Sequence, residues 1–246
     1  KQMLPLKGMI FAAGLGTRLY PLTADRPKAL VEINGVTLLE HAINKLVDAG
    51  IADIVINIHH FSDLVRQFID NHKPFNANIY FSDESEKLLD TGGGLKFASP
   101  FFQNTNSILL YNVDIISNIN LQKMCDFHLQ QAPLATLAVR NRETFRYFIF
   151  DKNSKQLCGW TNIKTGEKIE TNPTQSPINL AFSGIHIVSP KILELIPENE
   201  KISLTKIYLT LASQNKIVAY DHSDDSWQDM GKYEEVIAYN ATKKAH

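Results

Sequence analysis

The chain has only two cysteines in 246 residues, and it carries no surplus of charge of either sign. Cys125 and Cys158 are too few for a disulfide framework or a zinc cluster. With 25 basic and 26 acidic residues, the sequence lacks the cationic excess typical of nucleic-acid-binding proteins, and it has no acidic tail. We therefore expect no nucleic-acid partner and no polyanionic partner larger than a nucleotide.

Long hydrophobic runs are also missing from the chain. No apolar stretch approaches the roughly 18 residues that would cross a bilayer. Residues 1–5 contain no apolar signal core, and we exclude them from the fold prediction as a trimmed or added leader. The sequence therefore predicts a cytoplasmic protein that has no membrane partner.

What the chain does contain is an alternation of short β-rich runs and helical stripes, which favours a parallel sheet with crossover helices. Strands are expected over residues 9–13, 53–58, 78–82, 107–112, 133–139, 180–188 and 216–220. Helices are expected to end at Gly50, to begin at Ser62, to end near Pro100, to cover residues 121–130, 190–196 and 203–213, and to begin at Tyr233. These elements predict a Rossmann-like α/β fold with a mostly parallel sheet flanked by helices.

The pattern changes after residue 146. Residues 147–150 and 156–160 are short strand-like runs, and a turn follows at residues 164–166. We therefore predict a small antiparallel insertion. It is expected to fold over the carboxyl ends of the parallel strands, where open α/β sheets bind ligands.

A glycine-containing loop follows the first predicted strand and carries two fixed cations, Arg18 and Lys28. Gly14 and Gly16 allow the backbone to turn tightly and to direct its N–H groups at an anion. The two cations supply the charge that a triphosphate and a departing pyrophosphate require. The loop is also longer than usual strand-to-helix connections, and long ordered loops are usually functional. We therefore predict that the loop binds a nucleoside triphosphate and that Arg18 and Lys28 act in catalysis.

Two other glycine motifs do not fit this loop. A dinucleotide-binding fingerprint requires a third glycine at position 19, where the chain has leucine, and the next predicted strand begins too late, at Asp53. A P-loop motif occurs nowhere in the chain. An ordinary turn after a buried strand would explain the glycines but not the two cations.

Two aspartates from distant parts of the chain are candidate metal ligands. Asp114 follows a buried strand, so it should project from a carboxyl edge of the sheet near the glycine loop, and Asp229 follows the last strand. Mg²⁺ prefers hard oxygen ligands and usually takes only one or two carboxylates beside phosphate oxygens and water. We predict that both aspartates bind Mg²⁺, although each one taken singly would serve equally as a helix cap.

Glycines also cluster at residues 92–94, where three in succession permit the close approach of a flat base or a ribose. A flexible turn that enters a helix would explain the same residues. His59 and His60 end a predicted strand and show no metal-ligand spacing, so Asn57 is the more plausible substrate contact. The sequence shows no Ser/His/Asp arrangement that would indicate covalent catalysis.

The loop motif and the two aspartates together resemble the signature of the sugar-1-phosphate nucleotidyltransferase family, over essentially the whole chain. The motif residues are Gly14-Leu15-Gly16-Thr17-Arg18-Leu19-Tyr20-Pro21-Leu22-Thr23, Pro27-Lys28, Asp114 and Trp227-Gln228-Asp229-Met230-Gly231. The resemblance implies a fold of the nucleotide-diphospho-sugar transferase type. Within the family, the chain is most similar to uridylyltransferases that act on N-acetylmuramate 1-phosphate, and next to mannose-1-phosphate guanylyltransferases.

The resemblance also implies roles for individual residues. Residues 16–18 would hold the triphosphate, and Lys28 would contact the region of the α-phosphate. Asn112 and Gly184 would face the sugar phosphate. The expected nucleotide-binding residues are Ala12, Ala13, Gly14, Gly16, Thr17, Arg18, Lys28, Thr91, Gly92 and Gly93.

One part of the family pattern has no clean equivalent here. Many members bind the sugar phosphate with a Glu-Lys-Pro segment, and the candidates in this chain are Glu167, Lys168 and Glu170. Val113 replaces a common glycine and Lys232 a common threonine, but both changes leave the proposed charged groups in place.

These features predict one domain over residues 1–246, in which residues 7–140 bind the nucleotide and residues 141–246 bind the sugar phosphate. The expected reaction transfers a nucleoside monophosphate from UTP to N-acetylmuramate 1-phosphate and releases pyrophosphate. Three alternatives remain: a mannose- or heptose-1-phosphate guanylyltransferase, a phosphocholine cytidylyltransferase with an aromatic cage of Tyr147, Phe148 and Trp160, and a non-catalytic nucleotide-sugar sensor. We expect a monomer or a small homo-oligomer.

Overall fold

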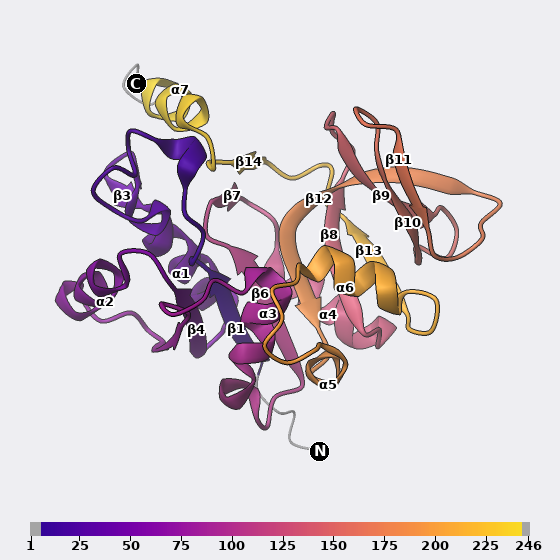
Figure 1. Ribbon diagram of the computed structural model, residues 1–246, viewed down its shortest axis with the longest axis horizontal. Helices are drawn as coiled ribbons and strands as arrows, with labels where there is room; N and C mark the ends of the chain where they lie inside the picture. The colour runs from indigo at the N-terminus through magenta and orange to yellow at the C-terminus, as the bar shows by residue number, and fades with distance from the viewer. Residues whose placement is uncertain (1–5, 243–246) are drawn as a thin grey trace.

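A mixed sheet of ten strands organises the chain (Figure 1). The computed structural model describes residues 6–242, so the leader expected at residues 1–5 lies outside the described part. The parallel strands, in spatial order, are β5 (Asn78–Asp83), β4 (Asp53–Ile58), β1 (Leu6–Phe11) and β6 (Ser107–Asn112). A second parallel pair joins β8 (Ala135–Arg140) to β13 (Ile217–Asp221). The predicted parallel sheet is therefore confirmed.

The remaining strands of this sheet run antiparallel to their neighbours. They are β9 (Arg146–Asp151), β10 (Leu157–Asn162), β11 (Glu167–Glu170) and the long β12 (Pro177–Val188). Strand β12 pairs with β6, β8 and β9, so it joins the parallel strands to the antiparallel extension. The main path of the sheet is β11-β10-β9-β12-β6-β1-β4-β5. The antiparallel insertion is confirmed, but β9–β11 extend the sheet sideways from β12 (Figure 1).

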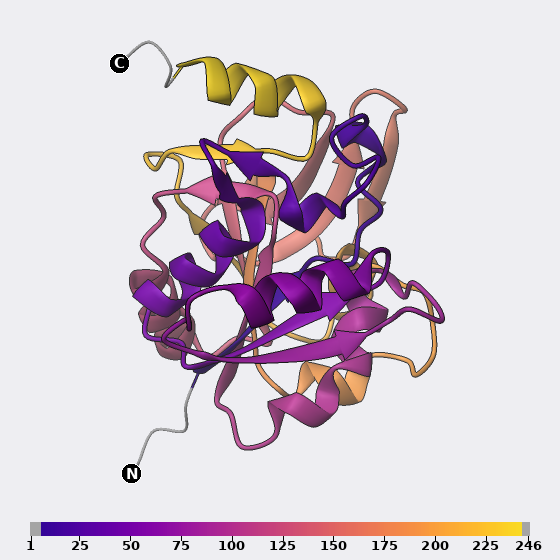
Figure 2. The ribbon, with the colours of Figure 1, turned by 90° about the vertical axis from the view of Figure 1, so that its left-hand side faces the viewer.

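Helices cover both faces of the sheet. One face carries α1 (Leu38–Asp48), α2 (Ser62–Asn71) and α4 (Leu121–Gln131), and the other carries α3 (Asp90–Phe97), α5 (Ile192–Leu195) and α6 (Leu204–Leu211). Helices α1 and α2 lie on the side that faces the viewer in Figure 2. Successive residues of β1 supply both cores: Ile10 packs on the first face, whereas Met9 and Phe11 pack on the second. Such two-sided burial is typical of the strands of parallel sheets.

Two short strand pairs lie outside the large sheet. Strand β2 (Glu32–Ile33) pairs with β3 (Val36–Thr37), and β7 (Ile115–Ser117) pairs with β14 (Trp227–Asp229). Helix α7 (Tyr233–Thr242) follows β14 and lies far from the N-terminal strand (Figure 2). The sequence did not predict either pair. The second one brings together segments more than a hundred residues apart.

Local sequence accounts for several helix ends. The side chains of Thr37, Asn120 and Ser203 accept backbone N–H groups in the first turns of α1, α4 and α6. Gly50 follows α1 with φ of +84°, which confirms the predicted end of that helix. Helix α2 begins at Ser62 as predicted, but its first turn has no side-chain cap. Within residues 6–242, no helix combines the length and apolarity needed to traverse a bilayer.

Candidate active site

The glycine loop is held by a side chain from the neighbouring strand. Asn57, in β4, accepts hydrogen bonds at Oδ1 from the backbone N–H groups of Ala12 and Ala13, at 2.7 and 3.2 Å. Gly16 has φ of +66°, a conformation that favours glycine, and its carbonyl accepts a hydrogen bond from Thr23 Oγ1 at 2.9 Å. Asn57 lines the cavity, but its oxygen is engaged by the loop, so it acts here to position the backbone.

A buried carboxylate completes this arrangement. Glu84 follows β5 and is 2 % exposed. Its Oε2 accepts from Asn57 Nδ2 at 2.7 Å, and its Oε1 accepts from the N–H of Leu89 at 3.0 Å. Burial raises the pKa of Glu84, whereas these two hydrogen bonds favour the charged form. The sequence analysis missed Glu84, and its place directly after a strand at the carboxyl edge is the signal that would have found it.

Cations and carboxylates from three segments converge at Gly231. Lys28 Nζ lies 3.0 Å from Asp114 Oδ2. The pairing of β7 with β14 brings Asp229 beside Asp114. The N–H of Met230, which follows Asp229, donates to the backbone carbonyl of Asp114 at 2.7 Å. A Cβ atom placed on Gly231 would lie 2.8 Å from Asp229 Oδ1 and 2.9 Å from Asp114 Oδ2. The same atom would lie 3.1 Å from Arg18 Nη2, so all four predicted charged groups belong to one site.

The chemistry of the two aspartates fits a hard divalent cation. Burial raises the pKa of Asp229, and the nearby charge of Asp114 raises it further. A cation between these carboxylates would offset both effects. Within residues 6–242 there is no group of three or more His, Cys, Asp or Glu side chains arranged to hold a metal. Two carboxylates suffice for Mg²⁺, because it usually completes its coordination with phosphate oxygens and water.

The charged groups open into a cavity of about 530 Å³. The predicted site residues that line it are Ala13, Gly14, Arg18, Lys28, Asn57, Thr91, Asn112, Asp114, Gly184 and Asp229. Gly184 has φ of +74°, and a Cβ atom there would meet Asn112 Nδ2 at 2.8 Å. Asn112 and Gly184 therefore occupy one wall together, as their shared predicted role requires.

Other predicted residues do not reach the cavity. Those that do not line the cavity are Ala12, Gly16, Thr17, Gly92 and Gly93. The N–H groups of Gly92 and Gly93 both donate to the carbonyl of Ile202, at 2.8 and 3.1 Å. A Cβ atom on Gly93 would lie 2.2 Å from the carbonyl oxygen of Glu200. The close approach that these glycines permit is thus made by the chain itself, and Thr91 is their neighbour that reaches the cavity.

The candidate replacements for the Glu-Lys-Pro segment lie elsewhere. Glu167, Lys168 and Glu170 are exposed on the edge strand β11, where Lys168 and Glu170 form an ion pair. No residue of β9–β11 lines the cavity, so the expectation that the insertion folds over the site was wrong. The strands continue the sheet because their backbone groups pair with β12 and with one another. The predicted aromatic cage does not form at the cavity either, since Tyr147, Phe148 and Trp160 are not among its lining residues.

Arg142 and Trp227 are among the cavity residues to which the sequence analysis assigned no role. The guanidinium of Arg142 lies 4.4 Å from the centre of the Trp227 ring and donates to the carbonyl of Phe182 at 3.1 Å. All three residues line the cavity. Arg142 lies in the loop between β8 and β9. Trp227, in β14, is distant in the sequence, and the fold brings its indole against the Arg142 side chain.

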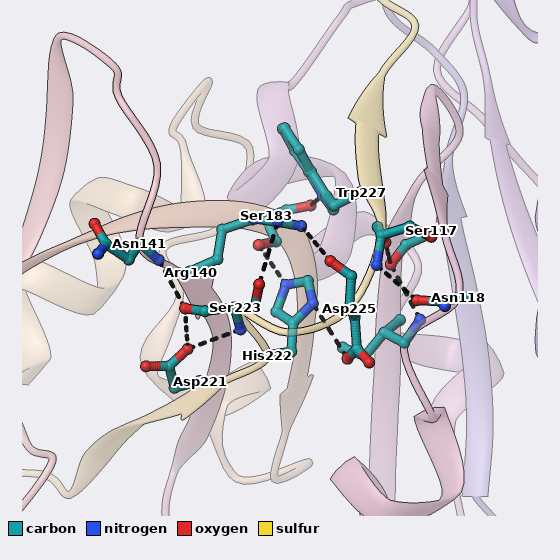
Figure 3. A network of polar contacts seen from close by, with 12 residues as sticks. Ser117, Asn118, Arg140, Asn141, Ser183, Asp221, His222, Ser223, Asp225 and Trp227 are labelled. Carbon is teal, nitrogen blue, oxygen red and sulfur yellow. Dashed lines mark hydrogen bonds and ion pairs between the residues drawn. The ribbon is translucent and has the colours of Figure 1, made fainter.

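A polar network fixes the position of Trp227 (Figure 3). Trp227 Nε1 donates to the carbonyl of Ser183 at 2.8 Å, and His222 Nε2 lies 2.6 Å from Ser183 Oγ. Arg140 donates to the carbonyl of Asp225 at 3.1 Å, and the Asp225 carboxylate lies 3.6 Å from His222 Nδ1. The order Asp225, His222, Ser183 resembles a nucleophile triad, but Ser183 is fully buried, with 0 % exposure. These groups therefore hold the loop before β14 in place.

With this geometry, comparison with known proteins decides the family. The sequence profile described as nucleotidyl transferase matches residues 7–245. The chain belongs to this family. It is 42 % identical over 244 residues to the N-acetylmuramate alpha-1-phosphate uridylyltransferase of Caulobacter vibrioides, with 96 % of each chain covered. It is 27 % identical over 238 residues to mannose-1-phosphate guanyltransferase 2 of Candida glabrata, and that match spans 95 % of this chain but only 63 % of the relative.

Solved structures confirm the fold. The UDP-glucose pyrophosphorylase of Acinetobacter baumanii superposes with a TM-score of 0.80 at 17 % identity, covering 97 % of this chain and 93 % of the other. HddC from Yersinia pseudotuberculosis, in a complex with GMP-PN, gives 0.77 at 20 % identity, covering 98 % of this chain and 100 % of the other. At this level of identity the likeness establishes architecture, and the nucleotide-diphospho-sugar transferase type of fold is thereby confirmed.

Proposed function

We propose that this chain transfers uridylate from UTP to N-acetylmuramate 1-phosphate, giving a nucleotide sugar and pyrophosphate, with Mg²⁺ held by Asp114 and Asp229. The observation that carries the proposal is the convergence of Arg18, Asp114 and Asp229 around Gly231, in a cavity that also contains Asn112 and Gly184. The 42 % identity to a uridylyltransferase, over nearly the full length of both chains, supports this pair of substrates.

The proposed step is an in-line displacement at the α-phosphorus. A phosphate oxygen of the acceptor forms the new O–P bond while the bond to the pyrophosphate oxygen breaks, and the electron pair leaves with pyrophosphate. No general base is required, because the attacking phosphate oxygen is already ionised at neutral pH. Catalysis then consists of positioning and electrostatic stabilisation.

Each charged side chain has a distinct part in this step. Arg18 is exposed at the mouth of the loop and would neutralise charge on the leaving pyrophosphate. Lys28 would bind the α-phosphate oxygens in exchange for its present partner, Asp114. A divalent cation bound to Asp114 and Asp229 supplies further positive charge to the phosphates.

The test is pyrophosphate release with Mg²⁺ across four nucleoside triphosphates and several acceptors: N-acetylmuramate, glucose, mannose and heptose 1-phosphates, and phosphocholine. Turnover confined to UTP with N-acetylmuramate 1-phosphate is expected. Turnover with GTP and mannose or heptose 1-phosphate would instead assign the chain to the guanylyl chemistry named for its more distant relatives. Binding without turnover for every pair would overturn the enzymatic proposal in favour of a nucleotide-sugar sensor.

A further inference from the structure

Arg142 brings into the cavity a positive charge that the proposed phosphate chemistry does not use. Its side chain is half-buried, and its Nε atom is buried without a hydrogen-bond partner. The guanidinium makes one hydrogen bond, to the neutral carbonyl of Phe182. Among residues 6–242, no carboxylate lies within ion-pair distance of Arg142. This differs from Lys28, whose charge is balanced directly by Asp114.

Such an arrangement is costly unless a ligand completes it. Partial burial disfavours the charged form and lowers the pKa of Arg142. The more distant charge of Asp229 opposes this shift only in part, and a guanidinium remains protonated in proteins. A buried charge is normally paired, and a guanidinium with unused N–H groups matches a carboxylate in bidentate geometry. The free donors of Arg142 therefore favour an anionic ligand in this part of the cavity.

The ring beneath the guanidinium holds it in place. Trp227 contacts Arg142 through the face of its indole at 4.4 Å, and its Nε1 is bound to the carbonyl of Ser183. The network in Figure 3 holds the residues next to that indole. The hydroxyl of Ser183 is hydrogen-bonded to His222, and Ser226, which precedes Trp227, donates its N–H to Asn118 Oδ1 at 2.8 Å. Arg142 is thus preorganised, which reduces the entropy lost when a ligand binds.

The acceptor must place its phosphate at the cluster around Gly231, because that is where Arg18, Asp114 and Asp229 converge. Arg142 belongs to a different wall, made with Phe182 and Trp227. An acceptor that reaches both walls would present a second anionic group to Arg142. N-acetylmuramate carries such a group, a carboxylate on its lactyl ether.

We propose that Arg142, stacked on Trp227, binds a carboxylate of the acceptor sugar and thereby selects sugar 1-phosphates that carry an acidic substituent. This inference rests on the proposed transfer function and specifies its acceptor class. Arg142 acts as a specificity-determining residue, and the phosphate loop and the carboxylate pair carry out the chemistry.

The test compares N-acetylmuramate 1-phosphate with its carboxamide, which has the same shape without the charge. For the unchanged protein with UTP, we expect kcat/KM to be roughly 10- to 100-fold lower for the carboxamide, the usual value of a charge-assisted hydrogen bond. Arg142→Gln should lower kcat/KM for the carboxylate by a similar factor and leave the carboxamide nearly unaffected. The kcat/KM of Arg142→Lys for the carboxylate should lie between those of the unchanged protein and Arg142→Gln. Lysine keeps the charge but cannot bind a carboxylate in the planar bidentate geometry of arginine.

The matched control is Arg146→Gln, which removes an exposed arginine from the start of β9, outside the cavity. It should leave both acceptors unaffected. Activity of Arg142→Gln on the carboxamide shows that the variant is folded.

Two results would overturn the inference while leaving the transfer function standing. One is equal loss on both acceptors, which would assign Arg142 to the shared phosphate. The other is an equal kcat/KM of the unchanged protein for the carboxylate and for the carboxamide. Absence of turnover with every triphosphate and acceptor would instead overturn the proposed function, and this inference with it.

Discussion

Lys28 Nζ contacts Asp114 Oδ2 at 3.0 Å, so the lysine assigned to the α-phosphate and an aspartate assigned to the cation are direct partners. Both side chains are largely buried, with exposed fractions of 18 % and 9 %. Neither group can therefore be changed without altering the electrostatic environment of the other.

This pairing predicts that Lys28→Met will separate catalysis from cation binding. The variant should lose most of kcat, because the α-phosphate would lose the positive charge proposed to bind its oxygens. It should bind Mg²⁺ at least as tightly as the unchanged protein, because the ammonium that competes for Asp114 is gone. Calorimetric titration with Mg²⁺ measures this directly, and Asp114→Asn is the comparison that should lose both properties. Weakened Mg²⁺ binding in Lys28→Met would contradict this prediction.

Arg18→Ala should slow the chemical step far more than it weakens binding of the sugar phosphate. Arg18 is exposed and its charge is needed mainly where pyrophosphate departs, so removing it affects the transition state more than the acceptor complex. Single-turnover kinetics gives the rate of the chemical step, and equilibrium binding gives the affinity for the acceptor. Equal losses of rate and affinity would contradict the role of Arg18 in stabilising the departing pyrophosphate.

Gly231→Ala should abolish activity while preserving the fold. The added methyl group would lie 2.8 Å from Asp229 Oδ1 and 2.9 Å from Asp114 Oδ2, so it would crowd the two carboxylates that would hold the cation. Loss of Mg²⁺ binding by calorimetry, with an unchanged circular dichroism spectrum, is the expected result. Lys232→Ala, one residue along and exposed, should behave like the unchanged protein. Normal turnover by Gly231→Ala would show that the reaction occurs elsewhere.

The raised pKa of Asp229 predicts how the stability of the metal-free protein changes with pH. Its pKa in the folded, metal-free protein lies above the usual 3.8, so folding favours the protonated form. Its contribution to stability is therefore present below the ordinary pKa and is lost as the pH rises through the raised value. Asp229→Asn should be more stable than the unchanged protein at neutral pH without metal, and the difference should vanish on acidification. Urea unfolding of both proteins at several pH values measures this difference in the free energy of unfolding. A difference that grows on acidification would contradict the raised pKa of Asp229.

Asn57→Ala should weaken both the loop and the fold. The N–H groups of Ala12 and Ala13 and the carboxylate of Glu84 would lose their partner in a buried region, at about 1–3 kcal/mol for each unsatisfied group. Affinity for the triphosphate should fall along with the free energy of unfolding. Asn78→Ala removes an exposed amide bound to Asp53 and should change stability by no more than about 0.5 kcal/mol.

The sequence was sufficient to predict the charged centre because topology brings the ends of parallel strands to one edge. Arg18 and Lys28 follow β1, and Asp114 follows the adjacent β6, so order along the chain implied proximity in space. Asp229 was identified because it follows the last predicted strand, and the unpredicted pairing of β14 with β7 explains how it arrives there.

The remainder of the site depends on contacts that no local pattern records. Gly92 and Gly93 suggested a base pocket, yet the space they leave is filled by the carbonyls of Glu200 and Ile202. Arg142 lies in a polar loop that resembles any solvated turn, and its role depends on an indole supplied by β14. Such contacts between distant segments require the three-dimensional fold.

The long strand β12 also links the strands on the two sides of the cavity. Its first residues pair with β9, and its later residues pair with β8 and β6. Phe182, which pairs with β8, and Gly184 line the cavity. The strands on both sides of the cavity are therefore parts of one continuous hydrogen-bonded frame. They cannot swing apart as hinged lobes without breaking a central strand. We therefore expect this frame to be among the slowest regions of the protein to exchange its amide protons.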